Sequence, residues 1–211
     1  MLRLPALSRL VTAAGSYPLK HASSRALYEY WNCLRAGRAA PERGQLDPSA
    51  IRSILSDILM IEIGGPERFT VRLAGTRICS LMGRELKNRP FMEAFVPGDW
   101  PEMLRVLDEV AKTSTPMVGG LIGETTDKRL LELELLLLPL RHHGRTEARM
   151  LGSFAALTFP YWATLTPLVC LRIASSRVIE AIETLASGGP GTSDARLRAM
   201  RHLRVLRGGR A

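Results

Sequence analysis

Cysteines and long apolar runs are both scarce in this chain. Its 211 residues include three cysteines, Cys33, Cys79 and Cys170, which match neither a metal-binding nor a disulfide pattern. An odd, sparse set of this kind argues against a secreted disulfide framework and for a reducing compartment. No apolar run reaches the roughly 18–20 residues needed to cross a bilayer, because two glutamates interrupt 130–140 and Pro167 and Arg172 interrupt 161–174. We therefore expect a cytoplasmic globular protein without a membrane span.

Sequence signatures of catalysis are also missing. The glycines of 119–123 lie in a predicted strand and lack the Lys-Ser/Thr pair of a phosphate-binding loop. The chain has no GxSxG elbow, no HExxH and no kinase signature. The histidine pair 142–143 lies at a predicted hairpin tip, with no cysteine or carboxylate pattern around it, which favours a solvated turn over a metal site. We therefore expect no enzyme and no metal centre.

Acidic residues are missing from one end of the chain and rare at the other. Residues 1–28 hold four basic residues and no acid, and residues 190–211 hold six arginines against Asp194, within a net charge of +9. The remaining residues, 29–189, balance 19 bases with 19 acids. The basic character therefore belongs to the two ends. The first 20 residues favour either a frayed N-terminus or a transit-like or membrane-surface helix.

The segment 130–159 is predicted to form a long β-hairpin around which the fold is organised. Leucines at 131, 133, 135 and 137 share one face of a period-2 strand. The other face changes from Glu132 and Glu134 to leucines, so it should be half solvated and half covered. Leucine and glutamate also favour a helix, but Pro139 suits a strand better than a helix interior. The polar turn 142–146 then leads to a second strand over 149–159, where Gly152 indicates a close backbone approach.

The other elements follow from periodicity and capping signals. Ser23 or Ser24 is predicted to cap a helix over 25–36, whose apolar stripe should cover the half-apolar sheet face. Asp99 to Glu102 is predicted to form a capping box. The remaining predicted elements are a short helix from Pro48 burying Ile51, Ile54 and Leu55, strands over 58–63 and 69–74, short helices in 75–98, a helix over 100–112 with Met103, Leu107 and Val110 inward, a strand over 117–125, and a helix over 175–186.

This order predicts an α+β domain with a five-stranded antiparallel sheet and short helices on one face. The predicted divisions are a flexible basic N-terminus at 1–21, the domain with its N-terminal helix at 22–160, a trailing segment and helix at 161–187, and a flexible Arg-rich tail at 188–211. A small space between the sheet and the helices is the expected ligand pocket.

Three segments resemble a known family. They read ALYEYWNCLRAGRAAPERGQLDPSAIRSILSDILMIEI, RFTVRLAGTRICSLMGREL and LELELLLLPLRHHGRTEARMLGSFAAL. Together they are similar to PAS-like domains of alphaproteobacteria, over about residues 22–180. The resemblance implies a bacterial sensory or regulatory module in signal transduction, without catalysis of its own, and leaves the cofactor unknown. Cys79 matches neither the flavin-reactive cysteine of light-sensing PAS domains nor a haem-attachment motif, so we expect a packed thiol.

Two sets of residues are candidate sites. Apolar side chains that either line or simply fill a cavity for a small apolar ligand are Val71, Leu73, Met82, Phe91, Phe95, Met103, Leu133 and Leu135. The resemblance implies a homodimer or a signalling protein partner, with contacts from Leu27, Tyr30, Trp31, Leu34, Leu136 and Leu138.

Two functions remain open at this point. The first is a non-catalytic PAS-type module acting through a small ligand or a protein partner. The alternative is non-specific binding of nucleic acid or another anionic surface by the Arg-rich tail, whose six arginines could neutralise several phosphates.

Overall fold

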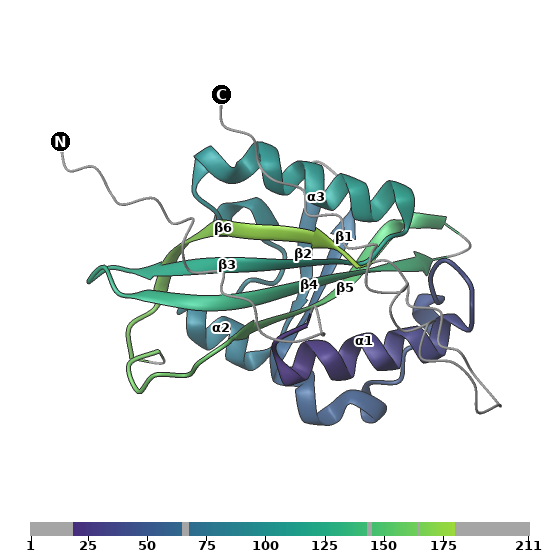
Figure 1. Cartoon of the computed structure of the whole chain (residues 1–211), viewed down its shortest axis with the longest axis horizontal. Helices are drawn as coiled ribbons and strands as arrows, with labels where there is room; N and C mark the ends of the chain where they lie inside the picture. The colour runs from purple at the N-terminus through teal and green to yellow at the C-terminus, as the bar shows by residue number, and fades with distance from the viewer. Residues whose placement is uncertain (1–18, 65–67, 143–144, 164, 180–211) are drawn as a thin grey trace, which may run out of the picture.

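The sheet is antiparallel and has six strands. The computed structural model describes residues 19–64, 68–142, 145–163 and 165–179 (Figure 1). The strand order is β2-β1-β5-β4-β3-β6. The strands are β1 (Ile58–Ile63), β2 (Phe69–Ala74), β3 (Met117–Thr125), β4 (Leu130–His142), β5 (Arg145–Ala156) and β6 (Leu168–Val178). The α+β class with an antiparallel sheet is confirmed, and the prediction of five strands is short by one.

Helical elements cover both faces of the sheet, with the helices of 76–113 on one face and the N-terminal helix on the other, as the predicted layout has it. The helical elements are α1 (Ala22–Arg35), η2 (Arg43–Gln45), η3 (Pro48–Asp57), α2 (Thr76–Met82), η4 (Phe91–Ala94), η5 (Pro97–Asp99) and α3 (Trp100–Thr113). Residues of α2, η4 and α3 share an apolar core with what we call the inner face of the sheet. Residues of α1 and η3 share a second core with its outer face.

The β4–β5 hairpin confirms the predicted centre of the fold. Leu133 pairs with Ala156 and Leu137 with Gly152. The odd-numbered leucines 131–137 belong to the inner core, whereas Leu136, Leu138 and Leu140 belong to the outer core. The outer-face leucines are covered by α1 as predicted. Glu134 departs from the prediction of a solvated position, because it is only 3% exposed.

The strand β6 replaces part of the predicted helix 175–186, and that prediction was wrong over the described residues, which end at 179. It pairs antiparallel with β3, where Gly119 faces Ser176 and Gly123 faces Leu171. A Cβ at Gly123 would lie 2.6 Å from the Leu168 side chain. The glycines of β3 therefore let β6 pack closely, which a local helical pattern does not reveal.

The helix α1 begins three residues before its predicted start, and its cap is not a serine. His21 is the N-cap residue, and its Nδ1 accepts a hydrogen bond from the Ser23 backbone N–H at 3.1 Å. Ser23 and Ser24 instead lie inside the first turn and are buried. The described structure thus uses both hydroxyls for contacts outside the helix.

Two further capping and packing predictions have different outcomes. The predicted helix from Pro48 is present as η3, and Asp47 caps it by accepting from the Ser49 N–H, but Leu55 is 37% exposed rather than buried as predicted. Asp99 makes no side-chain cap for α3. Its Oδ2 accepts from the Ile173 N–H of β6 at 2.8 Å instead. The predicted capping box is therefore wrong, because the carboxylate serves the edge strand.

The connection between β2 and α3 meets both edges of the sheet. On the β2 edge, Val71 exchanges hydrogen bonds with Arg89 and Asn88, at 2.9 and 2.7 Å. On the β6 edge, the Val96 N–H donates to the Leu171 carbonyl at 3.0 Å. Such contacts occupy edge groups that could otherwise pair with another chain.

Among the described residues, no helix combines the length and apolar character needed to cross a membrane. The predicted segments 1–18 and 180–211, which include the Arg-rich tail, lie outside the described residues.

Candidate functional site

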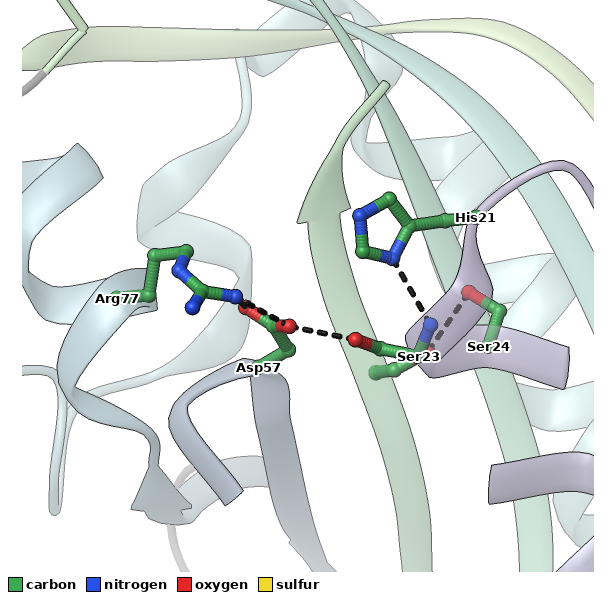
Figure 2. A network of polar contacts seen from close by, with 6 residues as sticks. His21, Ser23, Ser24, Asp57 and Arg77 are labelled. Atoms are coloured by element: carbon green, nitrogen blue, oxygen red, sulfur yellow. Dashed lines mark hydrogen bonds and ion pairs between the residues drawn. The ribbon is translucent and has the colours of Figure 1, made fainter. Parts of the chain in front are cut away.

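A polar cluster around the buried Asp57 joins the first turn of α1 to η3 and α2 (Figure 2). Asp57, at the end of η3, is 1% exposed and accepts from the Ser23 hydroxyl at 2.6 Å. Nη1 of Arg77, on α2, donates to both Asp57 oxygens at 2.7 and 2.6 Å. Burying a carboxylate without partners is costly, so Asp57 ties three separate helical elements together.

A second buried carboxylate lies on the outer face of β4. The Glu134 oxygens accept from the backbone N–H of Lys20 at 2.7 Å and of His21 at 2.9 Å. Beside it, the hydroxyls of Ser24 and Ser153 are 3.0 Å apart and fully buried. The outer face of the sheet thus receives the beginning of α1 through polar contacts.

A small cavity lies between the inner face of the sheet and the helices α2 and η4. Its volume is about 20 Å³, which is room for about one water molecule. It is lined by Leu59, Val71, Ile78, Met82, Arg84, Leu86, Arg89, Pro90, Phe91, Glu93, Ala94, Phe154 and Leu171. The wall is mainly apolar, with charged side chains from 84–93 among its lining residues.

A second cavity, of about 10 Å³, lies between α3 and strands β3, β4 and β6. Ser175 and Ser176 are among its lining residues. The Ser176 hydroxyl is buried and has no hydrogen-bond partner among the described residues. A single water is the natural partner for such a group.

The predicted cavity residues divide among these places. Val71, Met82 and Phe91 line the larger cavity, and Met103 and Leu135 line the smaller one. Phe95 and Leu133 are buried in the inner core without lining either cavity. Leu73 is 43% exposed and lies outside both. Whether any of them contacts a ligand stays a prediction.

The predicted partner face is largely occupied by the chain itself. Leu27, Trp31, Leu136 and Leu138 are at most 1% exposed in the outer core, between α1 and the sheet. Tyr30 is half-buried, and its hydroxyl accepts from the Asp47 N–H at 2.7 Å. Leu34 is also half-buried. The four buried side chains can contact a partner only if α1 moves, so their role in partner contact stays a prediction.

Sequence reasoning missed the carboxylates of Asp57 and Glu134 as site residues. In the sequence, Asp57 lies at the end of a predicted short helix, where an exposed polar residue is common. Glu134 reads as a solvated position in an alternating strand. The available signal was that Glu134 shares a face of the strand with Leu136, Leu138 and Leu140, which a helix was expected to cover.

Cys79 on α2 is a half-buried thiol beside a carboxylate. Its Sγ lies 3.8 Å from the Ala74 carbonyl oxygen and 3.6 Å from Glu85 Oε1. Burial raises the pKa of the Cys79 thiol, and the negative charge of Glu85 raises this pKa further, against a backbone hydrogen bond at Leu86 that lowers it. The thiolate is the reactive form, so this environment suppresses reactivity.

Replacing Glu85 by Gln is therefore expected to lower the Cys79 pKa and to speed its alkylation by iodoacetamide at pH 8. We expect about a two- to fivefold increase, because the rate follows the thiolate fraction. Site-resolved mass spectrometry measures the rate, with the exposed Cys33 as the reference in the same sample. The control is Glu132→Gln at an exposed position of β4, and equal Cys79 rates in both variants would contradict the prediction.

Metal binding has no support from the described side chains, among which no three His, Cys, Asp or Glu residues gather closely enough to hold an ion. His21 serves as a helix cap. The side chains at 142–143 and His202 lie outside the described set.

The arrangement of helices and strands defines the class of fold. An antiparallel sheet cups short helices on one face and carries an N-terminal helix on the other, which is a PAS fold. A family model described as a PAS domain matches residues 19–155. The chain therefore belongs to the PAS domain family, whose members are sensory signalling modules.

Solved structures give distant likenesses only. A light-oxygen-voltage domain studied with a flavin analogue is 15% identical, with a TM-score of 0.42, and the match covers 56% of this chain and 87% of that one. The Rhodobacter sphaeroides LOV protein is 13% identical, with a TM-score of 0.42 and coverages of 55% and 71%. A PAS domain from Colwellia psychrerythraea is 14% identical, with a TM-score of 0.41 and coverages of 52% and 97%. No curated protein matches the chain.

Proposed function

We propose that this PAS domain is a non-catalytic regulatory module that acts in signal transduction by binding a protein partner, either a second copy of the chain or another signalling protein. The observation that favours a partner over a small ligand is the size of the larger cavity, about 20 Å³. Pockets that hold small molecules usually measure roughly 300–1,000 Å³. A ligand would have to displace packed side chains of the inner core, whereas a partner would not.

A small apolar ligand is the second candidate. The cavity wall, which includes Val71, Met82 and Phe91, is mainly apolar, and an apolar molecule would suit it once the core opened. This route requires a rearrangement around η4, where Ala94 lines the cavity and is 6% exposed. Ala94 is thus the position at which the two candidates can be separated.

Native mass spectrometry of the chain purified from its own host tests the proposal. We expect the measured mass of the wild type to be that of a complex with a second copy or with another protein. Ala94→Val should form the same complex. The methyl groups added by Ala94→Val occupy space in the cavity and, because Ala94 is buried, leave the outer surface of the domain unchanged. Ala26→Val, at an exposed position of α1, is the matched control.

Two outcomes would overturn partner binding. One is a small molecule bound to the wild type and to Ala26→Val but lost from Ala94→Val, which would establish the ligand instead. The other is a bare monomer at every concentration measured, with neither adduct. If Ala94→Val still binds a small molecule, a protein partner is not the only ligand of the domain, and this result would also argue against the proposal.

The alternative function, binding of nucleic acid or another anionic surface by 188–211, stays a prediction, because that segment lies outside the described residues. A cytoplasmic location and a bacterial, alphaproteobacterial origin also remain proposals, supported by the sequence resemblance and the sparse cysteines.

A further inference from the structure

The most exposed apolar side chains of the described residues gather at one end of the sheet. Nine large apolar residues are at least 37% exposed, and the four of them on η3, β2 and α3 are at most 43% exposed. The other five, which we call the tip residues, are at least 50% exposed: Leu130, Phe159, Tyr161, Leu165 and Val169. Single exposed apolar side chains are ordinary, but a group of them marks a binding surface.

The strand register brings the segments that carry the tip residues together. Glu124, near the end of β3, pairs with Leu130 at the start of β4 and with Cys170 at the start of β6. Leu133 of β4 pairs with Ala156, the last residue of β5. The turn from β3 to β4 and the connection from β5 to β6 therefore lie at the same end of the sheet (Figure 1).

The connection from β5 to β6 is held in place by its own contacts. The Ala163 N–H donates to the Pro160 carbonyl at 3.0 Å, and the Leu165 N–H donates to the Trp162 carbonyl at 2.9 Å. Ala163 is 1% exposed in the inner core, and Trp162 packs against that core. Tyr161 and Leu165, by contrast, are 83% and 74% exposed. A partner that covers these two side chains gains the free energy of removing their apolar area from water.

The charges at this end are compatible with an anionic surface. From 157 to 171 the sequence has no charged residue. Beside it, Asp127 pairs with Arg129 at 2.8 Å, and Glu124 pairs with Lys128 at 2.5 Å. The Lys128 side chain is 80% exposed, whereas the exposed Glu132 lies two positions farther along β4 than the tip residue there. The net charge of the whole chain, +9, adds a long-range attraction to anionic membranes.

The kinds of side chain at this end fit a bilayer better than a protein. Phenylalanine, tyrosine and tryptophan all occur within 159–162, and the last two concentrate where proteins meet the membrane–water interface. A protein partner has to match the shape of the surface that it covers. A bilayer, in contrast, accepts apolar side chains of any shape that project into it. Because the tip residues project from separate segments, a lipid surface is the better match.

We propose that the tip residues form a membrane-contact surface, which inserts shallowly into an anionic bilayer while Lys128 and Arg129 lie near the lipid headgroups. Contact of this kind uses turns at the end of the sheet and needs no membrane-spanning helix. The inference goes beyond the proposed function and does not rest on it, because the purified chain and lipid vesicles are enough to test it.

Co-sedimentation of the full chain with vesicles of phosphatidylcholine and phosphatidylserine tests the proposal. Tyr161→Ser combined with Leu165→Ser should weaken binding about tenfold or more, because less apolar area leaves water on insertion. Both side chains are largely exposed, so thermal unfolding of this double variant should match that of the wild type. Vesicles of phosphatidylcholine alone should bind the wild type about tenfold more weakly, because they lack the negative surface charge.

The matched control is Leu73→Ser, the same change at an exposed leucine of β2, at the opposite edge of the sheet from β6. It should bind vesicles as the wild type does. All these chains share the same basic ends, so any binding by those ends contributes equally to each of them.

Three results would overturn the proposal. The first is a wild type that does not bind the anionic vesicles. The second is equal binding by the wild type and the double variant, which would assign binding to the basic ends. The third is unchanged vesicle binding with a loss of self-association in the double variant, measured by sedimentation velocity without lipid. That result would assign the tip residues to contact with a second copy of the chain.

Discussion

A Gly152→Ala chain is expected to lose about 3 kcal/mol or more of unfolding free energy. Gly152 lies in β5, between Leu137 of β4 and Leu59 of β1. A Cβ at this position would sit 2.4 Å from the Leu136 carbonyl oxygen. That oxygen belongs to the backbone of the neighbouring central strand, so it cannot move aside as a flexible side chain would. The expected fall in the melting temperature is about 6–12 °C.

Thermal and urea unfolding of the variant measure this loss. Gly98→Ala is the matched control, because a Cβ at Gly98 would meet no atom within 4 Å and its backbone is not left-handed. We expect the control to change the unfolding free energy by no more than about 0.5 kcal/mol. Equal melting temperatures for the two variants would show that β4 and β5 do not approach as closely as described.

The close approach at Gly152 could be predicted from sequence because its signal is local. A glycine within a regular strand pattern indicates a position where no side chain fits. The same holds for β1, β2 and β3, whose bounds match the predicted 58–63, 69–74 and 117–125. In each segment, alternation or a short apolar run coincided with turn residues at both ends.

The strand β6 could not be predicted this way. Its residues from Ser175 onward continue into a sequence with helical spacing, so a local interpretation favours a helix. The strand forms because β3 offers an edge with glycines at 119, 120 and 123. Tertiary pairing thus overrides the local preference, as it does for many short segments.

The structure of the candidate site depends even more on residues that are far apart in the sequence. Glu134 is buried because Lys20 and His21 reach it from 114 and 113 positions away. Period-2 alternation places Glu134 on a face of β4 but does not reveal what covers that face. The predicted cavity residues were mostly buried for the same reason that they were chosen, namely their apolar character. The volume left between them depends on packing, which composition does not determine.

Trp31 is the residue at which packing and partner contact give opposite expectations. Its side chain is 1% exposed, and its Nε1 donates to the Pro139 carbonyl oxygen at 2.8 Å. The ring also stacks on Tyr28, with centroids 6.0 Å apart. We therefore expect Trp31→Ala to lower the unfolding free energy by about 3–5 kcal/mol. Trp31→Phe keeps most of the apolar volume but removes the donor, and should cost about 1–3 kcal/mol.

Urea unfolding and sedimentation velocity on the same samples separate the two roles. Leu34→Ala, at a half-buried position one turn along α1, is the control and should cost no more than about 1 kcal/mol. If Trp31 mainly contacted a partner, Trp31→Ala would change the association state while leaving the unfolding free energy of the monomer unchanged. If the unfolding free energy is highest for the wild type, lower for Trp31→Phe and lowest for Trp31→Ala, the main role of Trp31 is packing in the chain's own outer core. Any effect on association would then follow from loosening α1, because the tryptophan and the leucines beneath it become accessible only when that helix leaves the sheet.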